Sequence, residues 1–113
     1  MRICRNNREL FKTVRPAVSV LERFFGLLGR KNIPESYVMY FPDCNSIHTF
    51  FMQTDIDVVM TDSGGRVVFY RENMKPWKTA VCLTAVNTLE MRAGAIRGLK
   101  LKLNDKLTIK RGR

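Results

Sequence analysis

Cysteine is scarce in this sequence, and the cysteines that occur do not form a recognisable set. Cys4, Cys44 and Cys82 are odd in number and widely separated, and no Cys-x-x-Cys pair is present. This spacing argues against a disulfide framework and is typical of a protein in a reducing compartment. We therefore expect a cytoplasmic location.

Long apolar runs are also lacking. A membrane-spanning helix needs about 20 consecutive apolar residues, and the runs here are far shorter. Residues 1–8 carry the positive charge of the first part of a signal peptide, but no apolar segment follows them. The sequence therefore predicts neither a transmembrane segment nor an export signal.

Repeats and low-complexity tracts are absent, and the composition is that of an ordinary globular protein. Of the 113 residues, 45% are hydrophobic and 27% are charged. A chain of this size buries roughly two-thirds of its unfolded surface, so one core suffices without a metal or a disulfide. We expect a basic arm or first strand at residues 1–15, a single β-rich domain at residues 16–109 and a basic tail at residues 110–113.

What the sequence has in excess is positive charge, and the charge lies at its two ends. The formal charge of +10 divides into +6 for residues 1–31, −2 for residues 32–93 and +6 for residues 94–113. One interpretation is contact with a polyanion or an acidic protein through residues 1–31 and 97–113. The other is that the charge only keeps a small protein soluble.

The motifs give little support to specific nucleic-acid recognition. The sequence lacks a zinc-finger spacing, a Gly-x-x-Gly loop in a helical setting and a strand with paired stacking aromatics. Phe50 and Phe51 are adjacent, so on a strand their rings would point to opposite faces. Two such rings do not form one stacking platform.

A short helix is predicted near the N-terminus. Ser19 and Glu22 have the spacing of a capping box, in which each side chain satisfies a free N–H group at the start of a helix. Apolar residues then recur at helical spacing up to Leu28, and Gly29 supplies a stop. The pattern predicts an amphipathic helix over residues 20–28 that packs against a sheet.

The rest of the chain has the pattern of strands. Runs of β-branched and aromatic residues at 37–41, 44–52, 55–61, 66–70, 80–83 and 88–91 alternate with turn residues. Gly64 and Gly65 indicate a tight hairpin, and Asn104 with Asp105 indicates a final turn before a last strand. We expect a mainly β fold, α+β at the margin: a small closed or strongly curled antiparallel β-barrel-like sheet with one short amphipathic helix near the N-terminus.

Several short motifs occur in a characteristic order along the chain. They are GLLGR (26–30), CNSIHTFFM (44–52), DVVM (57–60), GRVV (65–68), KPW (75–77), LEMRAG (89–94) and NDKL (104–107). Through these motifs the sequence resembles the family called domain of unknown function 192, also known as uncharacterised protein family 0127, over about residues 15–108. The resemblance implies a compact, β-rich single domain.

The chain departs from the family pattern at three places. Leu28 stands where a methionine is common, Met91 and Arg92 where Leu-Pro is common, and Asn104 where a glycine is usual. Asparagine tolerates the left-handed conformation that a turn at this position needs. The expected fold is therefore unchanged.

The single histidine lies in the motif CNSIHTFFM. If this stretch is one strand, alternate residues share a face, namely Cys44, Ser46, His48, Phe50 and Met52. A following strand that pairs back against it would bring the carboxylate of Asp57 beside His48. The carboxylate would then hold the imidazole in one tautomer.

Catalytic and metal-binding chemistry at this stretch is not predicted. Cysteine catalysis requires Cys44 within hydrogen-bond reach of His48, but residues i and i+4 of a strand lie roughly 13 Å apart. His48, Asp55, Asp57 and Cys44 have acceptable ligand types, but one histidine and no ligand-pair spacing do not indicate a metal site. We therefore expect no catalytic residue, no metal site and no cofactor.

Two other interpretations remain open. The first is a buried polar network that fixes the register of the hairpin, with Ser46, His48, Thr49 and Asp57 as its members. The second is a groove for a ligand or a peptide, lined by His48, Phe50, Met52, Asp57 and Trp77. For Trp77 itself we expect a ring that covers the edge of the core, with exposure to a partner as the alternative.

The function that these patterns favour is a small non-enzymatic module that binds a ligand or a protein. Its candidate site comprises Cys44, Ser46, His48, Thr49, Phe50, Met52, Asp57 and Trp77. One alternative is a metal-dependent or other hydrolase centred on His48 and Asp57. Another is non-specific nucleic-acid binding through the basic ends.

Overall fold

The structure of the protein is a computed structural model that describes residues 1–17 and 32–111. The helix predicted over residues 20–28 lies outside the described residues. Within them the regular structure is mainly strand, and helix α2 (Ala95–Leu99) lies near the C-terminus. The prediction of a mainly β fold is therefore confirmed. None of the helices in the described ranges has the length and apolar character needed to cross a membrane.

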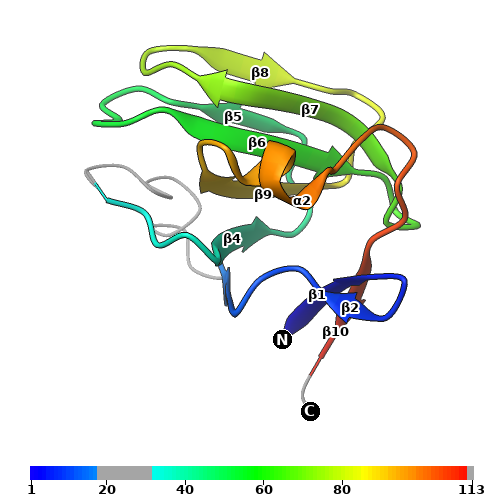
Figure 1. Ribbon diagram of the computed structural model, residues 1–113. Helices are drawn as coiled ribbons and strands as arrows, with labels where there is room; N and C mark the ends of the chain where they lie inside the picture. Colours follow the sequence, from blue (N-terminus) through cyan, green and yellow to red (C-terminus); the bar gives the residue numbers. More distant parts are fainter. Residues whose placement is uncertain (18–31, 112–113) are drawn as a thin grey trace.

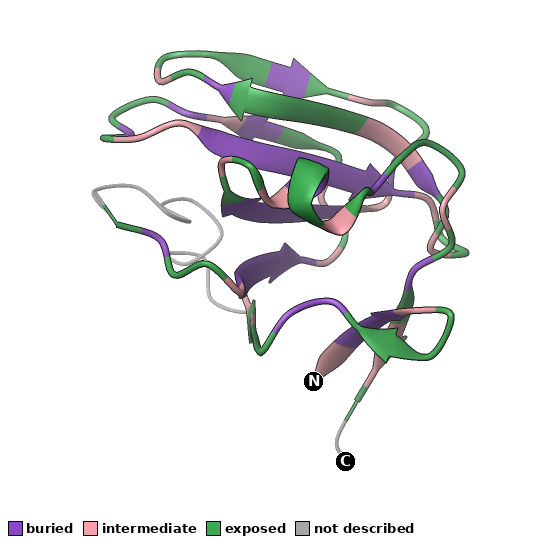
Figure 2. Ribbon diagram, viewed as in Figure 1, coloured by how far each residue is buried: buried purple, intermediate pink, exposed green. Residues whose placement is uncertain are grey.

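A five-stranded sheet, counted over the described residues, forms the middle of the molecule (Figure 1). Its strands, in spatial order, are β3 (Thr13–Pro16), β4 (Tyr37–Phe41), β9 (Asn87–Arg92), β6 (Ile56–Thr61) and β7 (Val67–Met74). The pair β3 and β4 is parallel, and the other pairs are antiparallel. Figure 2 shows that β4, β6 and β9 are buried almost throughout, as expected for strands covered on both faces.

Separate cores lie on the two faces of this sheet. One contains Ile56, Val58 and Met60 of β6 and is covered by the pair β5 (Ser46–His48) and β8 (Thr79–Val81). The other contains Val59 and is covered by α2 and by a small sheet. That sheet has the order β10 (Thr108–Lys110), β1 (Arg2–Arg5) and β2 (Arg8–Glu9). The alternation along β6 thus supplies both cores.

The prediction of a closed, antiparallel β-barrel-like sheet is wrong for the described part of the chain. The five-stranded sheet ends at β3 on one side and at β7 on the other, and β3 runs parallel to β4. The chain buries the two faces of an open sheet under small sheets and a helix, so the faces are covered without closure of the strands into a barrel.

The turns that were predicted from glycine and asparagine are present. Gly65 has a φ of 89°, and a Cβ at this position would collide with the carbonyl oxygen of Leu107. The Asp62 carboxylate accepts hydrogen bonds from the N–H groups of Gly64 and Arg66, both at 2.9 Å. Asn104 has a φ of 74° and so adopts the left-handed conformation expected of it.

Candidate functional site

The stretch from Cys44 to Met52 is not one continuous strand. Strand β5 ends at His48, and a turn follows at Phe50 and Phe51. The N–H of Met52 donates to the Thr49 carbonyl at 3.2 Å across this turn. The assignment of alternate residues to two faces therefore fails after His48, because it assumed an extended backbone throughout.

Thr49 joins this turn to the loop between β7 and β8. Its hydroxyl donates to the Lys75 carbonyl at 2.6 Å and accepts a hydrogen bond from the Lys78 N–H at 2.8 Å. Its backbone carbonyl accepts from the Trp77 N–H at 2.9 Å, and its own N–H donates to the Lys78 carbonyl at 2.8 Å. Thr49 is fully buried. Two loops distant in sequence are thereby held together at one point.

The joined loops bring three aromatic side chains into contact, and we call Phe50, Phe51 and Trp77 the aromatic cluster. The ring of Phe50 stacks on Trp77 with centroids 5.7 Å apart, and the ring of Phe51 meets Trp77 edge-on at 4.6 Å. His48 adjoins the cluster, with its ring centroid 5.1 Å from that of Phe50. The three residues of the cluster are 37%, 67% and 59% exposed in sequence order.

Two expectations from the sequence are corrected by the aromatic cluster. Phe50 and Phe51 lie in a turn, so both rings reach the same indole although the residues are adjacent in sequence. Trp77 does not cover the edge of the core, because more than half of the residue remains exposed. Exposed rings in mutual contact are more typical of a recognition surface than of a core.

The backbone at two members of the cluster is in a conformation that bulky residues rarely adopt. Phe51 and Trp77 each have a φ of 66°, in the left-handed region. This conformation costs roughly 1–2 kcal/mol for a residue with a side chain, so the surrounding hydrogen bonds must hold it in place. Such conformations concentrate at functional sites.

Asp57 lies on the other face of the five-stranded sheet, away from His48. Its carboxylate is fully buried and accepts hydrogen bonds from the N–H groups of Asn73 at 2.8 Å, Gly94 at 3.0 Å and Ile96 at 2.9 Å. The bond from Asn73 lies at the point where the β6–β7 register shifts. The bonds from Gly94 and Ile96 hold the start of α2. Asp57 is thus a structural anchor for three elements.

The predicted polar network of Ser46, His48, Thr49 and Asp57 is therefore wrong. Thr49 bonds to the β7–β8 loop, whereas Asp57 bonds to the α2 side of the sheet. Ser46 is exposed on β5 opposite Val81. The pairing of His48 with Asp57 was inferred from two strands that are not neighbours: β5 pairs with β8, and β6 pairs with β7 and β9.

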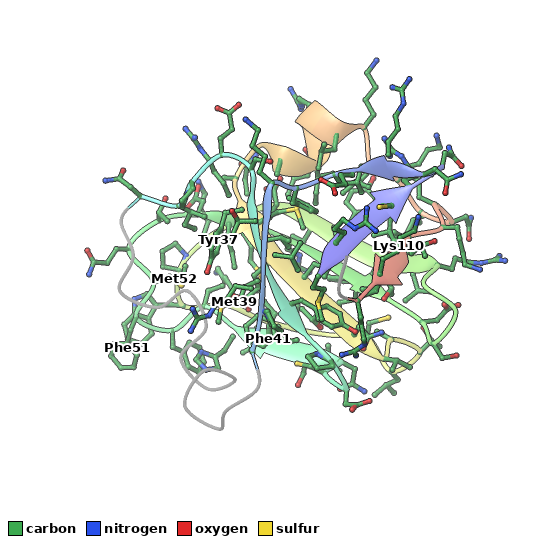
Figure 3. All side chains as sticks on the ribbon, turned by 90° about the horizontal axis from the view of Figure 1, so that it is seen from below. Tyr37, Met39, Phe41, Phe51, Met52 and Lys110 are labelled. Carbon is green, nitrogen blue, oxygen red and sulfur yellow. The ribbon has the colours of Figure 1, made fainter. Side chains whose placement is uncertain are left out.

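The remaining predicted site residues lie apart from each other. Met52 is buried in the core beneath β5 and β8, while Phe51 projects at the margin of the molecule (Figure 3). Cys44 is half-buried, and its thiol donates to the Ser46 carbonyl at 3.1 Å. In the described ranges no group of three or more His, Cys, Asp or Glu side chains is placed to hold a metal ion.

The surroundings of the aromatic cluster are polar. Lys75 forms an ion pair of 2.7 Å with Asp55, and Lys78 is exposed. This border of polar side chains around apolar rings was not foreseen as a unit, because its members come from two loops that are far apart in the sequence. The sequence signals were two separate ones, the adjacent pair Phe50 and Phe51 and the tryptophan of the KPW motif in a polar loop.

One protein-family model covers most of the chain. The family model DUF192, described as "Uncharacterized ACR", matches residues 2–109. The chain belongs to this family. The resemblance inferred from the ordered motifs is thereby confirmed.

Curated relatives within the family are UPF0127 proteins. One from Thermococcus kodakarensis is 36% identical over 97 residues, which are 81% of this chain and 61% of that protein. One from Thermococcus gammatolerans is 32% identical over 94 residues, which are 79% of this chain and 61% of that protein. The chain thus spans less than two-thirds of the length of these relatives.

Two solved structures share the fold. A Sinorhizobium meliloti protein described as a "putative transcription regulator" has a TM-score of 0.76 at 22% identity, covering 84% of this chain and 79% of its own. A Novosphingobium aromaticivorans protein of unknown function has a TM-score of 0.77 at 21% identity, covering 88% of this chain and 75% of its own. At these identities the likeness shows the fold alone.

Proposed function

We propose that this member of the DUF192 family is a non-enzymatic module that binds a partner polypeptide through the aromatic cluster. One observation carries this function: three exposed rings pack against each other on loops that the buried hydroxyl of Thr49 joins. Rings fixed in advance lose little conformational freedom on binding, so more of their contact energy contributes to affinity.

The partner class follows from the chemistry of the cluster. Tryptophan and other aromatic residues dominate the energy of protein interfaces, especially where a polar rim excludes water from the contact. Here the ion pair between Lys75 and Asp55 and the exposed Lys78 supply polar groups beside the rings. An apolar or aromatic segment of a partner polypeptide is the ligand that complements this arrangement.

A peptide selection tests the proposal. A phage-displayed library of random peptides, each about 12 residues long, is selected against the immobilised protein. Selected peptides should be rich in apolar residues and should change the fluorescence of Trp77, the only tryptophan in the chain. The Phe51→Ala variant should bind them at least about tenfold more weakly, as expected when a hot-spot residue is truncated.

A matched control is available on a different loop. Leu83 is 86% exposed and lies outside the aromatic cluster, so the Leu83→Ala variant should bind the selected peptides as the unmodified protein does. Peptides that bind Phe51→Ala and the unmodified protein equally well would contradict the proposal. Selection of peptides that leave the Trp77 emission unchanged would contradict it as well.

The geometry does not favour the hydrolase centred on His48 and Asp57. Both carboxylate oxygens of Asp57 are occupied by backbone N–H groups, and the five-stranded sheet lies between Asp57 and β5. The two side chains on which that alternative was based therefore do not share a site.

A further inference from the structure

The two basic ends of the chain meet in the sheet formed by β10, β1 and β2. Strand β1 pairs antiparallel with β10, which places Arg2 opposite Lys110 (Figure 1). The turn at residues 100–106 adds further cations, and Arg5 joins it to the sheet through the Asp105 carboxylate at 3.0 Å. We call this sheet together with residues 100–106 the basic end.

Like charges face each other across strands at the basic end. The directly opposed residues are Arg2 and Lys110, and Arg5 and Arg8; Lys106 in addition lies opposite Arg66, which adjoins the basic end. Like charges at such positions destabilise a pair of strands, whereas opposite charges would stabilise it. Three arrangements of this kind in one region indicate a requirement for positive charge other than the stability of the fold.

Part of this repulsion is offset within the protein. Arg5 bonds to Asp105 and to the carbonyls of Leu99 at 2.7 Å and Lys100 at 3.2 Å, and Arg2 lies 3.8 Å from Glu9. Lys102 also lies 3.9 Å from Asp105. In the part of the chain that the structure describes, Arg8, Lys106 and Lys110 form no ion pair.

We propose that the basic end binds nucleic acid through its phosphate backbone, without reading the base sequence. Unpaired arginine and lysine side chains attract phosphates and release the counterions condensed around them. Of the exposed large hydrophobic residues described, Leu103 is the one in the basic end. This surface therefore offers no exposed aromatic ring for stacking on bases and only one large apolar side chain for insertion into lipid. Backbone contact by charge alone is the mode of recognition that remains.

The placement of the charges also favours nucleic acid over a membrane surface. Cross-strand partners share a face, so Arg5 and Arg8 lie on one face of the small sheet and Arg2 and Lys110 lie on the other. A flat anionic bilayer would contact only one of these sets at a time. A polyanionic strand can follow the edge of the sheet and contact both.

This function is separate from the proposed peptide binding. Figure 3 shows Lys110 and Phe51 on opposite sides of the molecule, so the basic end and the aromatic cluster do not form one surface. Failure of one proposal therefore leaves the other standing.

Fluorescence anisotropy with a labelled DNA of about 20 nucleotides, as a single strand and as a duplex, tests the inference. Binding should be measurable near 50 mM salt and should weaken steeply as salt is added. The triple variant Arg8→Gln, Lys106→Gln, Lys110→Gln should bind at least about tenfold more weakly. Its plot of log affinity against log salt should be shallower by roughly 2–3, about one for each cation that no longer meets a phosphate.

A second triple variant controls for net charge. Arg71→Gln, Lys75→Gln, Lys78→Gln removes the same number of cations from strand β7 and the β7–β8 loop and should bind within about threefold of the unmodified protein. Circular dichroism and a thermal melt test whether both triple variants are folded. If the first triple variant is not folded, the single variant Arg8→Gln replaces it.

Several results would overturn the inference. They are the absence of DNA binding near 50 mM salt, equal losses in the two triple variants, and a larger loss in the second. Binding to vesicles of phosphatidylglycerol and phosphatidylcholine that is tighter than binding to DNA, at equal anionic charge, would assign the basic end to a membrane. Tighter binding to polyglutamate than to DNA would assign it to an acidic protein.

Discussion

The buried hydroxyl of Thr49 joins two loops that are far apart in the sequence. It accepts from one backbone N–H and donates to a carbonyl, in a place from which water is excluded. Both backbone groups would be left without a partner if the hydroxyl were removed. A residue with no recognition role of its own thus sets the position of Phe51 and Trp77.

We predict that Thr49→Val lowers the free energy of unfolding by about 1–3 kcal/mol. Valine has nearly the same shape, so the loss reports the hydroxyl and not the packing. Urea denaturation followed by far-UV circular dichroism measures it. Thr49→Ser keeps the hydroxyl, so its free energy of unfolding should fall by only about 1 kcal/mol, for the missing methyl group. Equal stability of the valine and serine variants would disprove the role assigned to the hydroxyl.

Tyr40 gives the protein a specific sensitivity to alkaline pH. Burial raises the pKa of its phenol above 10.0, and nearby Asp43 adds to the rise while Arg111 opposes it. The folded state therefore keeps the proton at a pH where the unfolded chain has lost it. This contribution to stability is complete below pH 10 and is lost as the pH rises through the folded-state pKa.

We predict that Tyr40→Phe makes the decline of stability above pH 10 less steep. Denaturation curves recorded at a series of alkaline pH values measure the decline. Tyr70→Phe is the control, because Tyr70 is 39% exposed and lies on the edge strand β7. If the Tyr40 and Tyr70 variants gave the same slope, Tyr40 would not be the responsible group.

At the scale of secondary structure, Asp57 shows how one side chain can connect several elements. It lies in β6, accepts an N–H of β7 and holds two N–H groups at the start of α2. Helix α2 has only five residues, and its N-cap residue, Gly94, has no side chain of its own with which to cap it. Such a short helix is unstable by itself, so its position depends on this carboxylate.

We predict that Asp57→Asn destabilises the protein by roughly 2–4 kcal/mol, because an amide nitrogen replaces an oxygen that faces N–H donors. The loss is measured by chemical denaturation, and faster amide hydrogen exchange at Gly98 and Lys100 would locate it in α2. The matched variant Asp55→Asn breaks only the surface pair with Lys75 and should cost less than about 1 kcal/mol. If amide hydrogen exchange in α2 of the Asp57→Asn variant were as slow as in the unmodified protein, Asp57 would not be the residue that holds α2.

The central strands could be predicted from the sequence, but their partners could not. The apolar runs at 37–41 and 55–61 became β4 and β6 because such runs suit buried strands. Helix α2 was missed because glycines flank and interrupt it, and the pattern there resembles a turn. Asp57 binds backbone N–H groups, and such partners cannot be recognised from the sequence. Its wrong pairing with His48 followed from the assumption that two consecutive strands pair with each other.

The candidate site could be located but not assembled from the sequence. Phe50 and Trp77 were both selected, but the turn that brings Phe51 to Trp77 depends on hydrogen bonds between Thr49 and residues 26 to 29 positions away. Propensities act locally and contain no information on such contacts. The positive charge of the two ends, in contrast, can be read directly from the sequence. What the structure adds is that β1 pairs with β10, which brings the two ends together.

At the scale of the whole molecule, two different surfaces lie on opposite sides of one fold (Figure 3). The aromatic cluster depends on apolar contact, whereas the basic end depends on charge. At 0.1 M, salt largely screens the interaction between exposed charges that are more than about 10 Å apart, whereas it leaves apolar contact nearly unaffected. The two surfaces should therefore respond independently to solution conditions and to substitution.

We predict that peptide affinity at the aromatic cluster changes by less than about twofold when Arg8, Lys106 and Lys110 are all replaced by glutamine. Sites this far apart with no shared partners have additive effects. Titrations monitored by Trp77 fluorescence, with and without saturating DNA, measure the coupling. A change of tenfold or more, about 1.4 kcal/mol, would mean that the surfaces are linked through the framework.

The pairing of β1 with β10 also determines when this fold can be completed during synthesis. The ribosome makes Arg2 roughly 100 residues before its partner Lys110. At about 5–20 residues per second, β1 waits several seconds for β10, its strand edge open in the meantime. Charged side chains on an open strand edge disfavour pairing with another chain, so we expect Arg2, Arg5 and Arg8 to limit aggregation of the unfinished chain during this interval.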